Sequence, residues 1–191
     1  MPKLNVTRFQ IEGPALVEPP VHGDERGWFC ETWNRADWLD AGLPDVDWVQ
    51  DNQAFSAAPA TTRGLHFQAP PHAQAKLIRV LRGRIFDAIV DLRVGSPTYG
   101  KAMHVELSGK SPAAFFVPVG FAHGYQTLAT DTMVTYKVSA HYAPASEGGL
   151  LWSGIGPNIP WPMPEGVVMS GRDFTWPTLG DLQSPFRYGD T

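Results

Sequence analysis

The fold class follows from the stretch Lys76-Leu77-Ile78-Arg79-Val80-Leu81, with Gly83 next, and then Ile85-Phe86-Asp87-Ala88-Ile89-Val90-Asp91-Leu92. Branched and aromatic side chains of this density are typical of β-strands, and the glycine is typical of a turn. We therefore predict a β-hairpin here. Further strands are predicted at residues 102–107, 114–117, 124–127 and 133–139. Short strands at such close spacing indicate a β-sandwich or a jelly-roll barrel.

The composition agrees with an all-β fold. The 191 residues include 19 glycines and 18 prolines without low-complexity tracts, which favours many short elements joined by turns. Hydrophobic residues make up 43% of the chain, so a packed core is expected, and the length suggests one domain covering residues 1–191. The only helix that we predict is a short one at residues 35–41, with Asn34 as its N-cap.

Charge and cysteine content exclude several classes of protein. A net charge of −4 argues against a broad nucleic-acid-binding surface. With a single cysteine, Cys30, no internal disulfide can form. The first twelve residues lack the apolar core of a signal peptide, and no apolar run is long enough to span a bilayer. We therefore expect a cytoplasmic protein.

The chain after Ala143 is rich in proline, which disfavours regular helices and central strands. We predict an irregular tail that wraps the barrel and returns one residue to a site at its mouth. The prolines are Pro144, Pro157, Pro160, Pro162, Pro164 and Pro177.

Residues that suit acid–base chemistry lie in strand-like segments, which include residues 63–68. Because side chains alternate along a strand, His66 and Gln68 share a face, and Tyr136 shares one with two valines. If those faces line the barrel interior, His66 and Tyr136 meet across a cavity. Strict alternation places Arg63 opposite to His66, but Gly64 could bend the strand and bring both inward.

Each candidate also has a simpler interpretation. His66 could be a structural histidine, Tyr136 a core residue, Asp173 a turn cap and Lys76 a solvated lysine, and His72 is expected at the surface. A metal site needs three or four convergent ligands. His66, His72 and His123 could contribute, but no close His-x-His pair supports such a site, so we expect no metal.

Motifs along most of the chain decide between these interpretations. In this order they resemble the dTDP-4-dehydrorhamnose 3,5-epimerase family over roughly residues 7–179. The motifs are Asp24-Glu25-Arg26-Gly27-Trp28-Phe29-Cys30-Glu31, Gln50-Asp51-Asn52, Arg63-Gly64-Leu65-His66-Phe67-Gln68, Gln74-Ala75-Lys76-Leu77, Val90-Asp91-Leu92-Arg93-Val94-Gly95-Ser96-Pro97-Thr98-Tyr99-Gly100, Val117-Pro118-Val119-Gly120-Phe121-Ala122-His123-Gly124, Trp161-Pro162 and Ser170-Gly171-Arg172-Asp173.

The resemblance implies a cupin-type jelly-roll fold and a catalytic role for four residues. His66 is the implied general base, Asp173 the carboxylate that orients it, Tyr136 the acid on the opposite face of the sugar, and Lys76 the group near the ketone oxygen. The implied substrate-binding residues are Arg63, Arg172, Gln50, Asn52, Gln68, His123, Tyr142, Arg26, Phe29 and Glu31, with Asp87 as a support for His123.

The resemblance also implies an assembly and a reaction. The expected assembly is a homodimer in which the segment from Arg26 to Glu31 reaches the thymidine of the neighbouring subunit. The expected reaction is epimerisation at C3 and C5 of dTDP-4-dehydro-6-deoxy-D-glucose through an enolate, in rhamnose biosynthesis, without metal or nicotinamide. Trp28, Cys30 and Trp176 depart from the common pattern and could alter pocket shape.

Three alternatives stay open at this point. The protein could invert only C3 or only C5 of a related 4-keto nucleotide sugar. It could be a metal-dependent cupin enzyme. It could also bind a sugar nucleotide without catalysis, although binding alone needs no acid–base pair.

Overall fold

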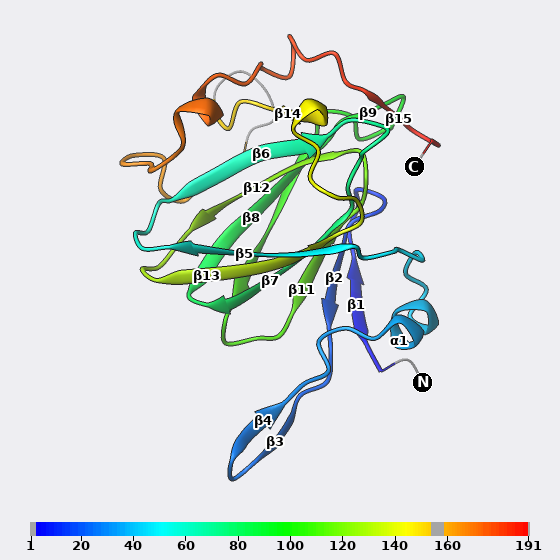
Figure 1. The fold of residues 1–191 in the computed structure, drawn as a ribbon, viewed down its shortest axis with the longest axis vertical. Helices are drawn as coiled ribbons and strands as arrows, with labels where there is room; N and C mark the ends of the chain where they lie inside the picture. The colour runs from blue at the N-terminus through cyan, green and yellow to red at the C-terminus, as the bar shows by residue number, and fades with distance from the viewer. Residues whose placement is uncertain (1–2, 154–158, 191) are drawn as a thin grey trace.

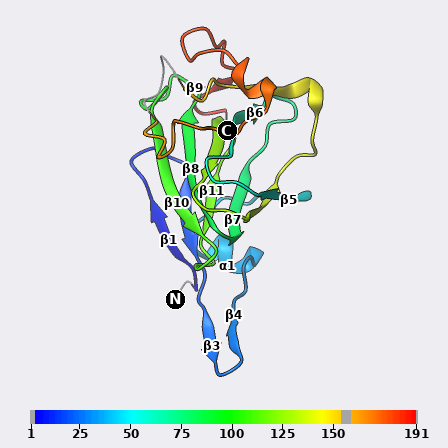
Figure 2. The ribbon, with the colours of Figure 1, turned by 90° about the vertical axis from the view of Figure 1, so that its left-hand side faces the viewer.

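The computed structural model describes residues 3–153 and 159–190 and consists of two antiparallel sheets that face each other. The six-stranded sheet has the order β1-β2-β11-β7-β13-β5 and the five-stranded sheet the order β10-β8-β12-β6-β14 (Figures 1 and 2). The first sheet contains β1 (Asn5–Arg8), β2 (Ala15–Glu18), β5 (Gln50–Ser56), β7 (Lys76–Arg82), β11 (Ala114–Val117) and β13 (Thr132–Val138). The second contains β6 (Thr62–Gln68), β8 (Arg84–Asp91), β10 (Ala102–Ser108), β12 (Phe121–Thr127) and β14 (Glu147–Gly149). The predicted all-β sandwich is confirmed.

Three apolar clusters hold these layers together. The first fills the space between the sheets and includes Ile78 from β7 and Ile89 from β8. The second lies on the outer face of the five-stranded sheet, beneath the C-terminal tail, where Trp161 packs on Phe86. The third lies on the outer face of the six-stranded sheet and is covered by α1 (Arg35–Asp40). Apolar side chains on both faces of the central strands explain their near-continuous hydrophobic sequence.

The predicted strands exist, but the predicted hairpin is wrong. Within the described residues, β7 and β8 are not neighbours, because β11 and β13 occupy both edges of β7 and β10 and β12 both edges of β8. Gly83, with φ of +80°, carries the chain from one sheet to the other. A Cβ there would lie 2.3 Å from Oγ1 of Thr132, so the crossing requires glycine.

The predicted helix is confirmed as α1, and the side chain of Asn34 caps it by accepting hydrogen bonds from the backbone N–H groups of Ala36 and Asp37. Before this helix, β3 (His22–Asp24) and β4 (Gly27–Phe29) form a hairpin that projects away from the sandwich (Figure 1). We refer to residues 22–29 as the arm. No helix among the described residues is long and apolar enough to cross a membrane.

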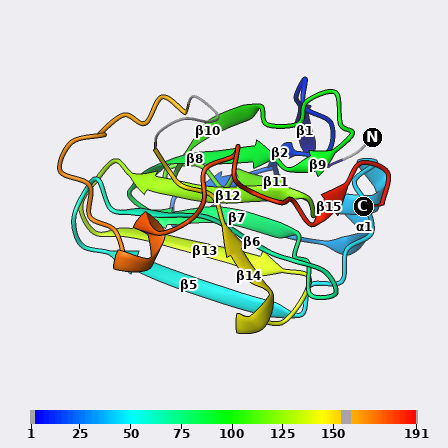
Figure 3. The same cartoon turned by 90° about the horizontal axis from the view of Figure 1, so that it is seen from above.

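Residues 144–153 and 159–190 form the predicted irregular tail, which packs over the outer face of the five-stranded sheet (Figure 3). It contains the 3-10 helices η1 (Pro144–Ser146) and η2 (Gly171–Phe174), and also β14. Its last short strand, β15 (Phe186–Arg187), pairs with β9 (Arg93–Val94). Pro157, one of the prolines behind this prediction, lies outside the described residues.

Candidate active site

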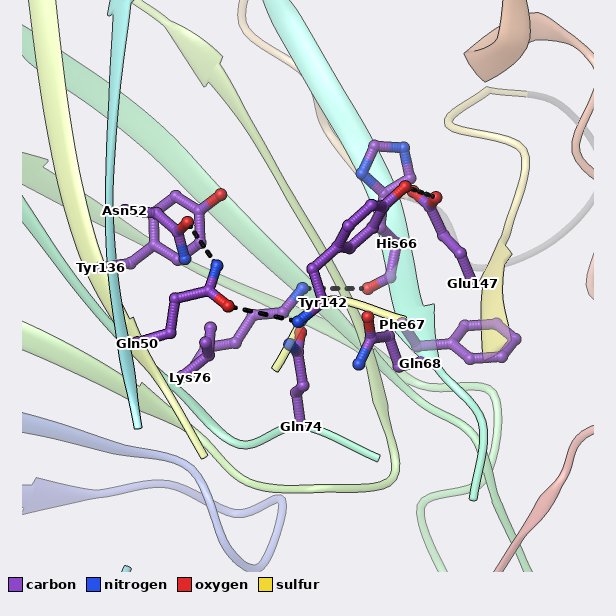
Figure 4. A pocket seen from close by; sticks show the side chains of 11 residues that line it. Gln50, Asn52, His66, Phe67, Gln68, Gln74, Lys76, Tyr136, Tyr142 and Glu147 are labelled. Carbon is purple, nitrogen blue, oxygen red and sulfur yellow. Dashed lines mark hydrogen bonds between the residues drawn. The ribbon is translucent and has the colours of Figure 1, made fainter. Parts of the chain in front are cut away.

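The candidate active site is a cavity between the two sheets, lined by side chains from β6 on one sheet and β5, β7 and β13 on the other (Figure 4). It has an outer part of about 330 Å³ and an inner part of about 260 Å³, and His66, Lys76 and Tyr136 line both. His66 comes from β6 in one sheet, whereas Lys76 and Tyr136 come from β7 and β13 in the other. The predicted meeting of His66 and Tyr136 across one cavity is therefore confirmed.

His66 is paired with a carboxylate that the tail supplies. Nε2 of His66 lies 2.6 Å from Oδ1 of Asp173, across 107 residues of sequence. Asp173 belongs to η2, which Ser170 caps by accepting from the backbone N–H of Asp173. A carboxylate oxygen can only accept, so Nε2 carries the hydrogen and Nδ1 of a neutral His66 holds the free lone pair. The pair leaves His66 equipped as a base.

Burial lowers the pKa of His66 from its ordinary value, and the positive charge of Lys76 acts in the same direction. The hydrogen bond to Asp173 opposes this shift without cancelling it. For Asp173, burial alone would raise the pKa, but hydrogen bonds from His66 and Trp176 outweigh it and hold the pKa low. Near neutral pH, the pair therefore consists of a neutral imidazole and a carboxylate.

Burial shifts the pKa of both Tyr136 and Lys76, in opposite directions. Burial raises the pKa of Tyr136, so its phenol keeps its proton. Burial lowers the pKa of Lys76 to about 8, although Asp87 and Glu147 oppose the shift. The ammonium Nζ lies 3.4 Å from the backbone oxygen of His66, which places it beside the base.

Arg63 reaches the same cavity because β6 is irregular at Gly64. The register between β6 and β12 shifts between His123 and Tyr125, and Gly64 has φ of +111°. A Cβ on Gly64 would lie 2.6 Å from the backbone oxygen of His123, so only glycine allows this approach. Arg63 and His66 therefore both line the inner cavity, as the predicted bend requires.

A second histidine–carboxylate pair lies deeper in the sandwich. Nε2 of His123 in β12 lies 2.8 Å from Oδ1 of Asp87 in β8, and both side chains are buried. Tyr125 lines the inner cavity beside them, and burial raises its pKa to well above the ordinary value. The expected support of His123 by Asp87 is present.

The mouth of the cavity is built by polar side chains from three segments (Figure 4). The amide of Gln50 donates to Asn52 at 2.8 Å. The hydroxyl of Tyr142 donates to Glu147 at 2.7 Å, and Glu147 also pairs with Arg172 at 2.8 Å. These contacts bring four of the predicted substrate-binding residues to the rim.

Gln68 is at the cavity, but its amide is occupied by the protein. It donates to the backbone oxygens of His72 and His141, and its own oxygen accepts from the backbone N–H of Ala143. It thereby ties two loops to β6. His72 is exposed, as expected.

Three predicted substrate-binding residues lie away from the cavity of their own chain, on or next to the arm. Arg26 pairs with Asp24, Phe29 is 69% exposed, and Glu31 accepts from Asn34. Neither part of the cavity is lined by any of them. The structure thus gives them no role within one chain.

Among residues 3–153 and 159–190, no three His, Cys, Asp or Glu side chains converge as a metal-binding group. His66 contacts the carboxylate of Asp173 in η2, and His123 contacts the carboxylate of Asp87 in β8. The side chains at this site are instead arranged in acid–base pairs.

Four polar side chains at the site were not among the predicted catalytic and binding residues, although Trp176 was expected to affect pocket shape. Glu147 and Gln74 line the outer cavity, Tyr125 lines the inner one, and Trp176 donates to Asp173. Glu147 lies in β14, inside the tail for which no strand was predicted, so alternation gave no signal there. Tyr125 shares a strand face with His123, and this period-two relation could have identified it.

A jelly-roll cavity with a histidine–aspartate pair on one sheet and a phenol and a lysine on the facing sheet is typical of a cupin-type enzyme. Residues 8–181 match the sequence model of the dTDP-4-dehydrorhamnose 3,5-epimerase family. The chain belongs to this family, and it is an isomerase of the epimerase type.

Relatives agree over almost the whole chain. A dTDP-4-dehydrorhamnose 3,5-epimerase of Sinorhizobium fredii is 46% identical over 94% of this chain and 92% of its own. The crystal structure of a dTDP-6-deoxy-D-glucose-3,5-epimerase from Legionella pneumophila in complex with dTDP-4-keto-L-rhamnose has a TM-score of 0.91 at 35% identity, covering 97% and 98% of the two chains. A 3'-monoepimerase from Streptomyces bikiniensis in complex with dTDP-quinovose has a TM-score of 0.81 at 32% identity, covering 90% and 86%.

Proposed function

We propose that the protein inverts C3 and C5 of dTDP-4-dehydro-6-deoxy-D-glucose to give dTDP-4-dehydro-L-rhamnose, in rhamnose biosynthesis. The observation that carries this proposal is the placement of a histidine–aspartate pair and a phenol on opposite sheets of one cavity, with a lysine beside the histidine. Inversion at carbon needs a base on one face of the ring and an acid on the other. Similarity to 3,5-epimerases supports this substrate.

The reaction proceeds in two proton transfers at each carbon. Nδ1 of His66 takes the proton from the carbon beside the ketone, and the electron pair of that C–H bond delocalises onto the ketone oxygen as an enolate. The phenol of Tyr136 then gives its proton to the same carbon from the opposite face, which restores the ketone. His66 returns its proton to solvent and the Tyr136 phenolate takes one up, so the enzyme is unchanged.

Lys76 stabilises the enolate oxygen. An ammonium group in a cavity of low dielectric is worth more than in water, and a well-placed donor contributes about 3–4 kcal/mol in comparable acyl-transfer cases. Because burial lowers the pKa of Lys76 to about 8, this charge is present at neutral pH but is lost at moderately alkaline pH. Asp173 keeps its negative charge and stabilises the imidazolium of His66 after proton transfer.

Further residues of the inner cavity and of its rim bind the rest of the substrate. Arg63 and Arg172 carry planar guanidinium groups that suit a diphosphate, because each can donate two hydrogen bonds at once. Gln50 and Asn52 present polar groups at the cavity mouth, where the nucleotide would lie, and Tyr142 faces the sugar. Gln68 and His123 shape the sugar pocket.

The proposal includes a homodimer in which the arm of one subunit completes the site of the other. Trp28 and Phe29 support this, because they are exposed aromatic side chains on a projecting hairpin. We test the assembly by sedimentation and by mixing Phe29→Ala subunits with His66→Asn subunits. A shared site predicts partial recovery of activity in the mixture, and its absence together with a monomeric parent contradicts the dimer.

Two further features belong to the proposal. Residues 1–191 act as one domain, since α1 and the tail both pack on the outer faces of the sandwich. The location is the cytoplasm, since Cys30 is a free thiol, as is usual in a reducing compartment.

Incubation of the protein with dTDP-4-dehydro-6-deoxy-D-glucose in D₂O tests the reaction. We expect NMR to show deuterium at both C3 and C5 and the ring stereochemistry of the L-rhamno product. In Tyr136→Phe, exchange should survive better than inversion, because the base is intact and the acid is missing. Unchanged inversion in this variant would remove Tyr136 from the mechanism.

A second candidate is inversion of C3 alone, which the similarity to the Streptomyces bikiniensis 3'-monoepimerase favours. The same base and acid would serve one carbon instead of two. Deuterium confined to C3 in the parent protein would select this candidate and rule out the first.

A further inference from the structure

Trp176 approaches the catalytic pair from the tail. Its indole Nε1 donates to Oδ1 of Asp173 at 3.2 Å, and Nε2 of His66 lies 2.6 Å from the same oxygen. One carboxylate oxygen thus receives two N–H groups. The indole and imidazole rings also meet edge to face, with centroids 6.1 Å apart and an interplanar angle of 72°.

The indole itself is held in place from two sides. A Cβ on Gly149 in β14 would lie 2.4 Å from the ring, so the glycine makes room for the indole. The guanidinium of Arg172 lies 4.9 Å from the ring centroid on top of it. The next residue, Pro177, accepts a backbone hydrogen bond from Leu151 at 2.8 Å. The indole is therefore held between Arg172 of η2 and Gly149 of β14.

We propose that Trp176 is a positioning residue that holds the Asp173 carboxylate in the orientation which directs Nδ1 of His66 at the substrate. The inference rests on the proposed function and adds to it a residue outside the set of bases, acids and cations. A carboxylate bound by one donor can rotate and present either oxygen. Two donors on one oxygen restrict that rotation, and the imidazole ring then keeps one tautomer and one direction.

None of the charged groups described around the His66–Asp173 pair donates to Oδ1 of Asp173 as Trp176 does. Lys76 and Glu147 act on the charge of His66 from the cavity side. Arg172 covers the indole, and its charge is paired with Glu147 instead of Asp173. Ser170 accepts from the backbone N–H of Asp173 and positions the turn. Beside His66, Trp176 is the side-chain N–H donor that the described residues place on Oδ1.

Two substitutions separate the hydrogen bond from the packing. Trp176→Phe keeps an aromatic ring and loses the N–H, whereas Trp176→Gln keeps N–H donors and loses the ring. If positioning matters, kcat falls roughly tenfold in Trp176→Phe with KM within about twofold, and Trp176→Gln retains more activity. If Trp176→Phe is as active as the parent, or more active than Trp176→Gln, the proposal is overturned.

A spectroscopic measurement on the parent chain decides the case even if both variants unfold. The seven tryptophans are replaced by 5-fluorotryptophan, and the ¹⁹F signal of Trp176 is identified by its loss in Trp176→Phe or, failing that, by assignment of the other six. We expect this signal to shift with pH at the midpoint of the acid limb of kcat/KM, and the shift to vanish in Asp173→Asn. The signal of Trp161, which donates to the backbone oxygen of Trp152, should stay constant.

A Trp176 signal that is constant through the acid limb would overturn the proposal. That outcome differs from failure of the proposed function, in which the unlabelled parent does not exchange deuterium into the nucleotide sugar at all.

Discussion

The molecule contains two histidine–aspartate pairs that differ in how the chain supplies them. In the pair His123–Asp87, both residues lie on adjacent strands of one sheet, and the side chains are 9% and 0% exposed. In the pair His66–Asp173, the histidine lies on a strand and the aspartate comes from the tail, and the side chains are 31% and 6% exposed. The contact distances, 2.8 and 2.6 Å, are nearly equal.

The two pairs therefore differ in their surroundings and exposure, and hardly at all in contact distance. His123 is fixed by two strands and has its polar contact inside the sandwich, so it shapes the cavity. His66 keeps one ring nitrogen toward the cavity and a carboxylate behind it. The following predictions test how far this distinction holds, from the largest expected effect to the smallest.

The largest difference in kcat/KM is expected between the variants His66→Asn and His123→Asn. We expect His66→Asn to lower kcat/KM by about 10³–10⁴-fold, because a positioned general base contributes on that order. His123→Asn should lower it much less, since it removes a wall of the cavity and no proton acceptor. Steady-state kinetics check this, with thermal unfolding to confirm that the variants fold. Equal losses of kcat/KM in the two variants would contradict the assignment of different roles to His66 and His123.

Truncation of Asp173 should mainly lower activity, whereas truncation of Asp87 should mainly lower stability. We expect Asp173→Ala to lower kcat by about 10²-fold, less than loss of the base, because an orienting carboxylate usually matters less than the base. Asp87→Ala should instead reduce the free energy of unfolding by about 1–3 kcal/mol, because it leaves a buried imidazole nitrogen without its partner. Urea unfolding and kinetics on both variants measure the division. The prediction is contradicted if Asp173→Ala is less stable and more active than Asp87→Ala.

The pH dependence should report the groups around His66 and not those around His123. His66 must be neutral to accept a proton, so activity falls as pH drops through its pKa, which burial holds below the ordinary value. Lys76 must be charged, so activity falls as pH rises through about 8. In Lys76→Arg, the alkaline limb should move upward, because a guanidinium stays charged. A profile of kcat/KM for both proteins checks this, and an unmoved alkaline limb assigns it to another group.

Much of the fold could be predicted because its strands bury apolar side chains. The dense hydrophobic run of β8 and the capped turn of α1 were visible in the sequence. The inward turn of Arg63 was also accessible, since a glycine between two polar residues of a strand marks a bend. The pairing of His66 with Asp173 was implied by family resemblance, because no local pattern links residues so far apart.

The remaining features depend on tertiary structure. A glycine turn such as Gly83 does not indicate whether the next strand pairs with the preceding one or crosses to another sheet. Here the chain crosses, because other strands occupy both edges of β7 and both edges of β8. β5 was missed as a strand because its inward side chains, Gln50 and Asn52, are polar and line the cavity. Glu147 and Trp176 act through contacts made by the tail, which has no periodic pattern.

The pair His66–Asp173 joins residues 107 positions apart, and this separation has a consequence for the order in which the site is assembled. Contacts of such long range close late, because the intervening chain must first be ordered. During synthesis the ribosome releases the strand of His66 well before the segment of Asp173. A sandwich that collapsed before the tail arrived would therefore lack Asp173, Glu147 and Arg172, so the tail completes both the histidine–aspartate pair and the rim of the cavity.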